Sequence, residues 1–413
     1  MSQETFIARQ PIFDRRMRVR GYELLHRSGW NNAFSHADPD MATVELLNTS
    51  LLVNRLTDLT DGKLGFVNVT RNLLLQDFIR VMPSGHTVIE ILETVEPDDD
   101  VVRAVMALKS DGHLIALDDY VDDPKYDELV RLADFVKVDF MHPDLDHRRR
   151  VVEHRKRDGL QFLAEKVETH AEFEEAKEAG YSLFQGYFFA KPTITSRRDL
   201  PRNKGNYVQF LREMARAALD IDAVEEIIKR EISLSTKLLR YLNSVHFGVR
   251  TPMRSIRQAL LHLGEVPLKR WGTLIALSGL GDDKPLELVR LCLVRARFCE
   301  LLACEIGADE EALDHFLTGL FSALDALVDR PLDEALADMG LKDEIGAAIR
   351  GQGDGSLGRA FHLAVACEHG DVVMYQQIAK RLGLFETAVA QLYAEALFWA
   401  DSVFRPALLH GRA

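Results

Sequence analysis

The sequence contains few cysteines, and they form no recognisable pair. Its 413 residues include only Cys292, Cys299, Cys304 and Cys367, and no two of them make a Cys-x-x-Cys motif. This argues against a disulfide framework and against a structural zinc site. All four lie in apolar segments with a helical pattern, so we expect reduced cysteines in the core of a cytoplasmic protein.

The sequence also lacks the hydrophobic segments of a membrane or exported protein. No window approaches the roughly 18 uninterrupted apolar residues that a membrane-spanning helix requires. Glu4 and Arg9 interrupt the first residues, so we expect neither a signal peptide nor export. A membrane is therefore not an expected partner.

Positive charge is in deficit. The chain has 64 acidic against 51 basic residues, and its formal net charge is −13 at pH 7. Because nucleic-acid binding requires a basic face that neutralises phosphates, we do not expect it as the main role. The basic run HRRRVVEHRKRD, residues 147–158, has no interleaved aromatic residues, which favours a solvated outer helix.

Length and hydrophobic patterning predict two domains. The chain is 47% hydrophobic and 28% charged, as in globular proteins, and 413 residues exceed one ordinary core. Over the first 192 residues or so, short apolar runs alternate with amphipathic helical stretches, which favours a parallel sheet. A TIM-type barrel and a doubly wound sheet both fit this pattern. The runs lie at 64–69, 87–92, 113–119, 135–139, 161–168 and 182–189.

The strand pattern ends at a segment without apolar periodicity. Residues 190–206 contain two prolines, a glycine and mixed charges, which is typical of a domain boundary. Beyond it, apolar residues recur at helical spacing, and Trp271 falls in such a stretch, so we expect it in a core. The glycine-rich run at 351–358 follows a predicted helix and lacks the lysine of a phosphate loop, which indicates a turn. We predict an α/β domain over 1–195 and an all-α domain over 196–413.

Polar side chains stand where the predicted strands end. A parallel barrel brings the carboxyl ends of its strands to one face, where barrel active sites lie, so we expect these side chains to converge. Any one of them alone is better explained as an ordinary polar residue where a strand meets solvent. The residues are Glu23, Asn68, Glu90, Asp118, Asp119, Lys137, Asp139, Glu165 and Gln185.

Converging carboxylates repel one another unless protons or cations neutralise them. Two carboxylates about 4 Å apart repel by about 4 kcal/mol at an effective dielectric constant near 20. Oxygen ligands with one amide suit Mg2+ or Mn2+ better than zinc. The neighbours Asp118 and Asp119 can bridge two metal ions about 3.5–4 Å apart. Such a pair can hold a phosphodiester, activate a water and stabilise the leaving oxygen, so a two-metal site is expected.

The motifs at these positions resemble those of the EAL domain family. Gln10-Pro11-Ile12 and Glu23-Leu24-Leu25 resemble its opening segment. The runs FVNVT, VIEILE, ALDDY, VKVD, AEKVET and FQGYFFAKP follow in the family's order, so the resemblance covers nearly all of residues 6–192. It implies a TIM-type β/α barrel and a metal-dependent phosphodiesterase, a hydrolase that converts cyclic-di-GMP to pGpG in signal transduction.

The resemblance also implies a role for each of these side chains. One metal ion would be held by Glu23, Asn68, Glu90 and Asp118, and a second by Asp118, Asp119 and Glu165. Lys137 and Gln185 would orient the attacking water, with Glu165 as a further catalytic residue. Cyclic-di-GMP would be contacted by Gln10, Arg27 and Asp139, and Glu93 would anchor a loop.

Three positions depart from the family pattern. Leu24 replaces the alanine of the name motif, and Lys166 follows Glu165 where the family has glycine. The segment Tyr120–Pro124, YVDDP, replaces a glycine-containing loop that couples dimerisation to metal binding in the family. Proline fixes φ, and the freedom that glycine gives is missing. A catalytically silent sensor or protein-interaction regulator is therefore a second hypothesis.

The C-terminal half resembles the HDOD domain family. The resemblance is carried by residues 233–264, with Leu238, Leu239, Asn243-Ser244, Ser255-Ile256, Gln258-Ala259 and Leu263-Gly264. HDOD domains resemble HD-type metallohydrolases that lack the metal ligands, and no His-Asp dipeptide occurs in this sequence. Asp314-His315 has the reverse order, and we expect it at a helix N-terminus or on the surface. The resemblance to EAL–HDOD fusion proteins implies a non-catalytic module with an unidentified protein partner, and a homodimer.

Overall fold

The computed structural model describes most of the chain. The described residues are 6–27, 56, 60–76, 79–80, 82–141, 145–191, 202–216, 218–230, 234–235, 238 and 255–408. The chain forms two compact units, and each is described separately below. One contains Met1–Lys191 with Ala366–Gln377 and Phe385–Ala394, and the other contains Pro192–Val365 with Ile378–Leu384 and Glu395–Ala413.

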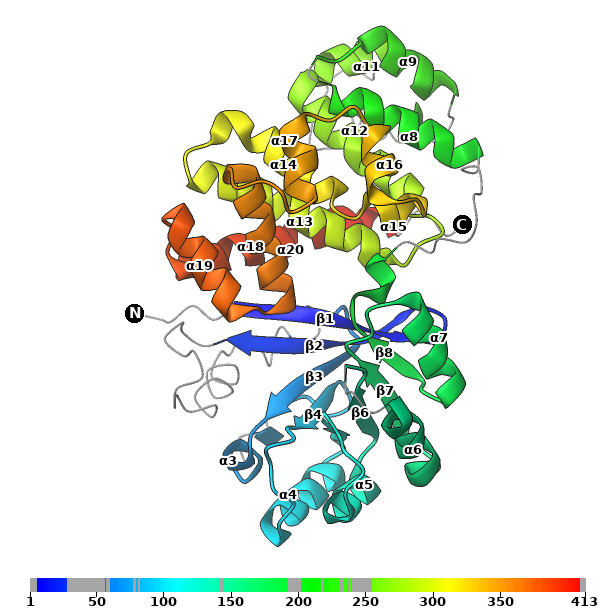
Figure 1. The fold of residues 1–413 in the computed structure, drawn as a ribbon, viewed down its shortest axis with the longest axis vertical. Helices are drawn as coiled ribbons and strands as arrows, with labels where there is room; N and C mark the ends of the chain where they lie inside the picture. Colours follow the sequence, from blue (N-terminus) through cyan, green and yellow to red (C-terminus); the bar gives the residue numbers. More distant parts are fainter. Residues whose placement is uncertain are drawn as a thin grey trace. The chain divides into compact units, whose positions relative to one another are not determined.

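The first unit is built on a closed barrel whose strands are ordered as they follow in the chain (Figure 1). Its strands are β1 (Phe6–Asp14), β2 (Val19–Arg27), β3 (Leu64–Val69), β4 (Thr87–Ile91), β5 (Leu114–Leu117), β6 (Phe135–Asp139), β7 (Gln161–Glu165) and β8 (Leu183–Gln185). β2 to β8 pair in parallel. β1 is antiparallel to both β2 and β8, so the expectation of a wholly parallel sheet is wrong for this strand. Of the two alternatives, the TIM-type barrel is confirmed.

One ring of apolar side chains fills the interior of the barrel. Seven strands each contribute one buried residue, and the rings of Phe66 and Phe135 pack edge to face at 5.3 Å. Burial of these side chains drives the closure of the sheet. The ring consists of Ile12, Phe66, Val88, Ala116, Phe135, Leu163 and Leu183.

Helices follow most of the strands, and Figure 1 shows α4 to α7 on the outside of the strands. The Thr169 hydroxyl and the Glu172 carboxylate form a capping box at the start of α7, and Gly180 ends that helix with φ of 107°. The helices are α3 (Arg71–Leu74), α4 (Asp99–Ser110), η2 (Pro124–Tyr126), α5 (Asp127–Leu132), α6 (Leu145–Arg155), α7 (His170–Ala179) and η3 (Tyr187–Ala190).

The last predicted strand is shorter than expected. Its run at 182–189 is a strand only to Gln185, and η3 begins at Tyr187. The break lies at Gly186, whose φ of 142° is unfavourable for a residue with a side chain. A Cβ at this position would overlap the backbone of Val167. Gly186 thus ends the strand directly after Gln185.

Replacing Gly186 by alanine is expected to destabilise the protein by about 2 kcal/mol or more, because overpacking adds to backbone strain. The measurement is the free energy of unfolding from urea titration. Gly159→Ala is the matched control, because Gly159 also has positive φ, 84°, but has no atom within 4 Å of the new Cβ. Equal losses in the two variants would contradict the role of the Val167 contact.

The remaining described chain is helical, as predicted. The helices are α8 (Arg202–Ala215), α9 (Ile221–Arg230), α11 (Ile256–Leu263), α12 (Glu265–Leu280), α13 (Leu286–Glu305), η5 (Asp309–Glu311), α14 (Ala312–Phe321), α15 (Leu324–Val328), α16 (Leu332–Ala337), α17 (Asp343–Ile349), α18 (Ser356–His369), α19 (Val372–Leu382) and α20 (Glu386–Leu408). α8 begins inside the segment 190–206 that was predicted as a linker. Within the described residues, none of the helices combines the length and apolar character needed to cross a membrane.

This part of the chain contains several single residues for which the sequence predicts a position. Trp271 is buried, as expected, and the glycine-rich run forms a non-helical connection only over 351–355, because α18 begins at Ser356. Cys292, Cys299 and Cys367 are buried, but Cys304 is exposed, so the core prediction is wrong for it. Asp314 and His315 lie in the first turn of α14, and His315 is fully buried rather than on the surface. Most of the motif at 233–264 that resembles HDOD domains lies outside the described residues.

Candidate active site

The predicted polar residues form a second layer directly above the apolar ring. Alternate residues of a strand face the same side of a sheet, so the residue two positions after a ring residue also points into the barrel. Phe66 is followed in this way by Asn68, and Val88 by Glu90. The same spacing places Asp118, Lys137, Glu165 and Gln185 two residues after Ala116, Phe135, Leu163 and Leu183.

The antiparallel strand obeys the same rule in reverse. β1 runs the other way, so its inward residue in the polar layer precedes the ring residue Ile12 by two positions, at Gln10. Gln10 is the register partner of Glu23 on β2, and Ile12 is the partner of Gln185 on β8. The three side chains meet there, because the Gln185 amide donates to Gln10 Oε1 at 2.8 Å and to Glu23 Oε2 at 2.6 Å.

A single lysine lies at the centre of the carboxylates. Lys137 is 1% exposed, and its Nζ pairs with Glu90 Oε1 and lies 2.9 Å from Asp118 Oδ1 and 2.7 Å from Glu165 Oε1. Glu23 Oε2 is 3.6 Å away. When all are ionised, four carboxylates against one ammonium leave a formal charge of −3. A buried excess of this size requires additional protons or cations.

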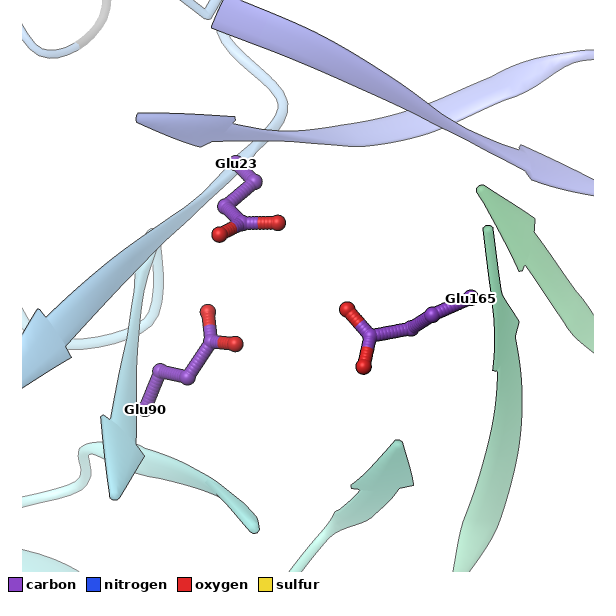
Figure 2. A group of neighbouring side chains, drawn as sticks. All are labelled: Glu23, Glu90 and Glu165. Atoms are coloured by element: carbon purple, nitrogen blue, oxygen red, sulfur yellow. The ribbon is translucent and has the colours of Figure 1, made fainter. Parts of the chain in front are cut away.

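The carboxylates form two groups that share Glu165. Glu23, Glu90 and Glu165 make the inner group, and Asp118, Asp119 and Glu165 make the outer group; in each, one ligand oxygen per residue lies within 4.8 Å of the others. Figure 2 shows Glu23, Glu90 and Glu165 pointing toward one another from three different strands. Either group matches the donor chemistry that Mg2+ and Mn2+ prefer.

Several oxygen atoms around these groups are buried and have no hydrogen-bond partner. Buried polar atoms are normally satisfied, so such a concentration indicates a ligand that binds oxygen. It also shows that the residues present fit a divalent cation. These atoms are Asn68 Oδ1, Glu90 Oε2, Asp119 Oδ1, Glu165 Oε2 and Gln185 Oε1.

Burial and crowding change the acidity of these groups. Burial, only partly offset by the Lys137 charge, raises the pKa of the Glu165 carboxyl to about 7. Burial and the negative charges of Glu165 and Glu23 raise the pKa of the Asp118 carboxyl to about 10. Burial also acts to raise the pKa of Glu23, but the Lys137 charge and hydrogen bonds from Gln185 and Asn68 hold it below its ordinary value. In the absence of cations, the site therefore retains protons near neutral pH.

Because a cation competes with these protons, its affinity is expected to depend on pH. A carboxyl with a pKa of about 7 is mostly protonated at pH 6 and mostly ionised at pH 8. Release of this one proton predicts at least about tenfold tighter Mn2+ binding at pH 8 than at pH 6, and release of the Asp118 proton, whose pKa is also raised, would increase the difference. Calorimetric titration with Mn2+ at both pH values measures the change. Equal affinities at the two pH values would show that the Glu165 proton is not displaced.

Asp119 and Asp139 lie at the edge of the polar layer and share a lysine. Lys166 Nζ is 2.7 Å from Asp139 Oδ2 and 3.5 Å from Asp119 Oδ2. Asp139 Oδ1 accepts the backbone N–H of Met141 at 2.6 Å. Asp119 and Lys166 both have left-handed φ, 38° and 54°. Strained backbone of this kind concentrates at functional sites.

The loop after the aspartate pair is held by ion pairs that sequence reasoning missed. Asp122 accepts from Arg155 Nε at 2.5 Å and pairs with His154 Nδ1 at 2.7 Å, and both partners lie on α6. The Tyr120 N–H donates to the Lys137 carbonyl at 2.9 Å. The basic run at 147–158 is thus used in part for internal contacts. The only sign of these contacts in the sequence is the high density of basic residues at 147–158.

Arg27 and Glu93 were also predicted to contribute to the site. The side chain of Arg27 lies outside the described residues, although its backbone ends β2. The Glu93 side chain is exposed, and its backbone carbonyl accepts from the Tyr126 hydroxyl at 3.2 Å. Gln10 and all the predicted ligands converge, whereas Asp139 contacts Lys166 at the edge.

Two family models match the chain. The EAL domain matches residues 2–192, and the HDOD domain matches residues 200–329. Among solved structures, the EAL-domain protein YkuI of Bacillus subtilis, in complex with cyclic-di-GMP and calcium, is 19% identical. This match covers 56% of the present chain and 73% of YkuI with a TM-score of 0.39, too low to inform on function.

Two curated proteins are similar along nearly the whole chain. The cyclic di-GMP phosphodiesterase CdgJ of Vibrio cholerae is 35% identical over 97% of this chain and 93% of its own length. The uncharacterized protein YuxH of Bacillus subtilis is 34% identical over 96% of this chain and 98% of its own length. Identity of this extent, with both domain matches, confirms the resemblance noted in the sequence. The chain therefore belongs to the family of proteins that join an EAL domain to an HDOD domain.

Proposed function

We propose that this protein is a divalent-cation-dependent phosphodiesterase that hydrolyses cyclic-di-GMP to linear pGpG. The observation that carries the proposal is the buried layer of carboxylates, amides and one lysine, with five oxygen atoms that have no hydrogen-bond partner. Such a layer suits cations and a phosphodiester better than it suits an empty interior. The activity in the name of the relative CdgJ supports the same substrate.

The proposed ligand assignment shares Asp118 between the two ions and assigns Glu165 to the second ion alone. Two cations would supply charge neutralisation at the phosphodiester and lower the pKa of the attacking water. Glu165 lies close to ligand oxygens of both acid groups, so its negative charge would act on both ions, although it is assigned as a ligand of the second ion only. The first ion would be held by Glu23, Asn68, Glu90 and Asp118, and the second by Asp118, Asp119 and Glu165. Mg2+ and Mn2+ are the proposed ions.

Lys137 and Gln185 would position the water. The Lys137 ammonium has three donor hydrogens, all directed among carboxylates that the cations would engage. Gln185 donates to Glu23 and Gln10, and its Oε1 has no partner, so it is free to accept from water. Addition of water to phosphorus breaks one P–O3′ bond, and the leaving 3′ oxygen takes a proton.

The substrate contacts and the helical half complete the proposal. Gln10, Arg27 and Asp139 would contact cyclic-di-GMP, and Asp139 would do so next to Lys166. The HDOD half, which we place at 196–413 after an EAL half at 1–195, would bind a protein partner without catalysis. A homodimer and a cytoplasmic site of action are further parts of this proposal.

Incubation of the purified full-length protein with cyclic-di-GMP and Mg2+ or Mn2+ tests the proposal. The expected product is pGpG, formed only when a divalent cation is present and not after chelation with EDTA. Binding of cyclic-di-GMP without product would instead support the catalytically silent sensor. Neither binding nor turnover with either ion would overturn the proposed function.

A further inference from the structure

Lys166 occupies a backbone position that disfavours lysine. Its φ of 54° is left-handed, a conformation that glycine adopts more readily than a residue with a side chain. It directly follows Glu165, the carboxylate that belongs to both acid groups. A lysine in such a conformation, next to the acid groups, suggests a role for its side chain there.

The side chain of Lys166 reaches the outer acid group. Its Nζ lies 3.5 Å from Asp119 Oδ2 and 2.7 Å from Asp139 Oδ2. Two buried oxygens of the outer group have no hydrogen-bond partner, Asp119 Oδ1 and Glu165 Oε2. Glu165 is only 6% exposed. The outer group therefore combines a fixed ammonium with donor atoms that remain available to a cation.

The two acid groups differ in the position of their ammonium. Lys137 lies inside the barrel, 1% exposed, in contact with carboxylates of both groups. Lys166 contacts only Asp119 and Asp139 among the described acids, and its side chain is 48% exposed. Its charge therefore acts most strongly on the outer group, and it reaches the inner group only through the shared Glu165.

We propose that Lys166 is a built-in counter-charge that weakens divalent-cation binding at the outer group, so that the inner group fills first and the outer group fills only at higher cation concentration. This inference rests on the proposed function, because it requires that the acid groups bind cations. An exposed ion pair between two singly charged groups is a weak interaction. A divalent cation carries twice that charge, so the Lys166 ammonium repels it more strongly than it would repel a monovalent cation. We expect outer-group affinity to be reduced about tenfold by the lysine charge.

Titration of the full-length protein with Mn2+ at pH 8, followed by the electron paramagnetic resonance signal of free Mn2+, tests this directly. The wild type is expected to show one tight and one weak class of site. In Lys166→Gln, which keeps the backbone strain but removes the charge, the weak class should become about tenfold tighter and the tight class should change far less. Lys166→Arg, which keeps the charge, should behave as the wild type.

Two further variants separate the effect of the lysine charge from that of the backbone strain and identify the acid group concerned. Lys166→Gly removes the charge and also relieves the left-handed strain, so it is expected to fold and to bind Mn2+ as Lys166→Gln does. Adding Asp119→Asn to Lys166→Gln should weaken the second class, which identifies it with the outer group. A Lys166→Gln isotherm equal to that of the wild type, or a change in the tight class alone, would overturn the inference. In either case the inference fails, and the pGpG assay decides the proposed function separately; absence of Mn2+ binding in every variant would overturn both.

Discussion

Replacing Glu165 by glutamine is expected to abolish pGpG formation, with a loss of about 1,000-fold or more, because charge stabilisation by the cations contributes several kcal/mol. Glu165 is the only residue common to the inner and outer acid groups found in the described chain. Glutamine has nearly the same shape but lacks the negative charge, so it would weaken both cation sites at once. The measurement is single-turnover pGpG formation at saturating Mn2+.

The matched control for this variant is Glu178→Gln. Glu178 is an exposed residue of α7 in the same barrel, and no acid group includes it. It should retain wild-type turnover. Mn2+ titration of Glu165→Gln should show weaker binding in both classes of site. Turnover within about tenfold of the wild type would contradict the assignment of Glu165, because one tenfold corresponds to only about 1.4 kcal/mol.

Replacing Lys137 by methionine is expected to destabilise the cation-free protein by about 3–5 kcal/mol at pH 8, which is the usual cost of breaking a buried ion pair. The substitution leaves Glu23, Glu90, Asp118 and Glu165 without the ammonium that contacts all four. Acids with raised pKa values hold protons in the folded state that they lose on unfolding, so stability increases as pH falls. The deficit relative to the wild type should therefore shrink markedly at pH 5.

Urea unfolding at both pH values, with and without Mn2+, measures this effect. Mn2+ should restore much of the loss at pH 8, because it binds the folded state and supplies the missing positive charge. Lys156→Met is the control, since Lys156 is exposed. An equal deficit at pH 5 and pH 8 would attribute the loss to packing of the lysine stem rather than to its charge.

The positions of the polar layer were predictable because strand geometry is local. Residues two apart face the same side, so a carboxylate or amide two places after a buried residue follows the core into the barrel. Glu90 after Val88 and Glu165 after Leu163 are examples. The boundaries of β3 and β6 match the apolar runs at 64–69 and 135–139.

The features that could not be predicted from the sequence depend on closure of the barrel. The reversed direction of β1 requires a turn at Asp14–Arg18, which has none of the usual glycine or asparagine signals and is held by the Asp14 carboxylate. The central position of Lys137 arises from carboxylates on four other strands or loops. Likewise, Asp122 and Arg155 are 33 residues apart, and only the packing of α6 brings them together.

The place of β1 between β2 and β8 also has a consequence for biosynthesis. β1 ends at Asp14 and pairs with β8, which begins only at Leu183. The intervening 168 residues, from 15 to 182, take roughly 10–30 s to translate at about 5–20 residues per second. During that interval the nascent chain presents an open β edge, which invites pairing with other chains. We therefore expect a requirement for chaperone protection on the ribosome until the seam of the barrel is closed.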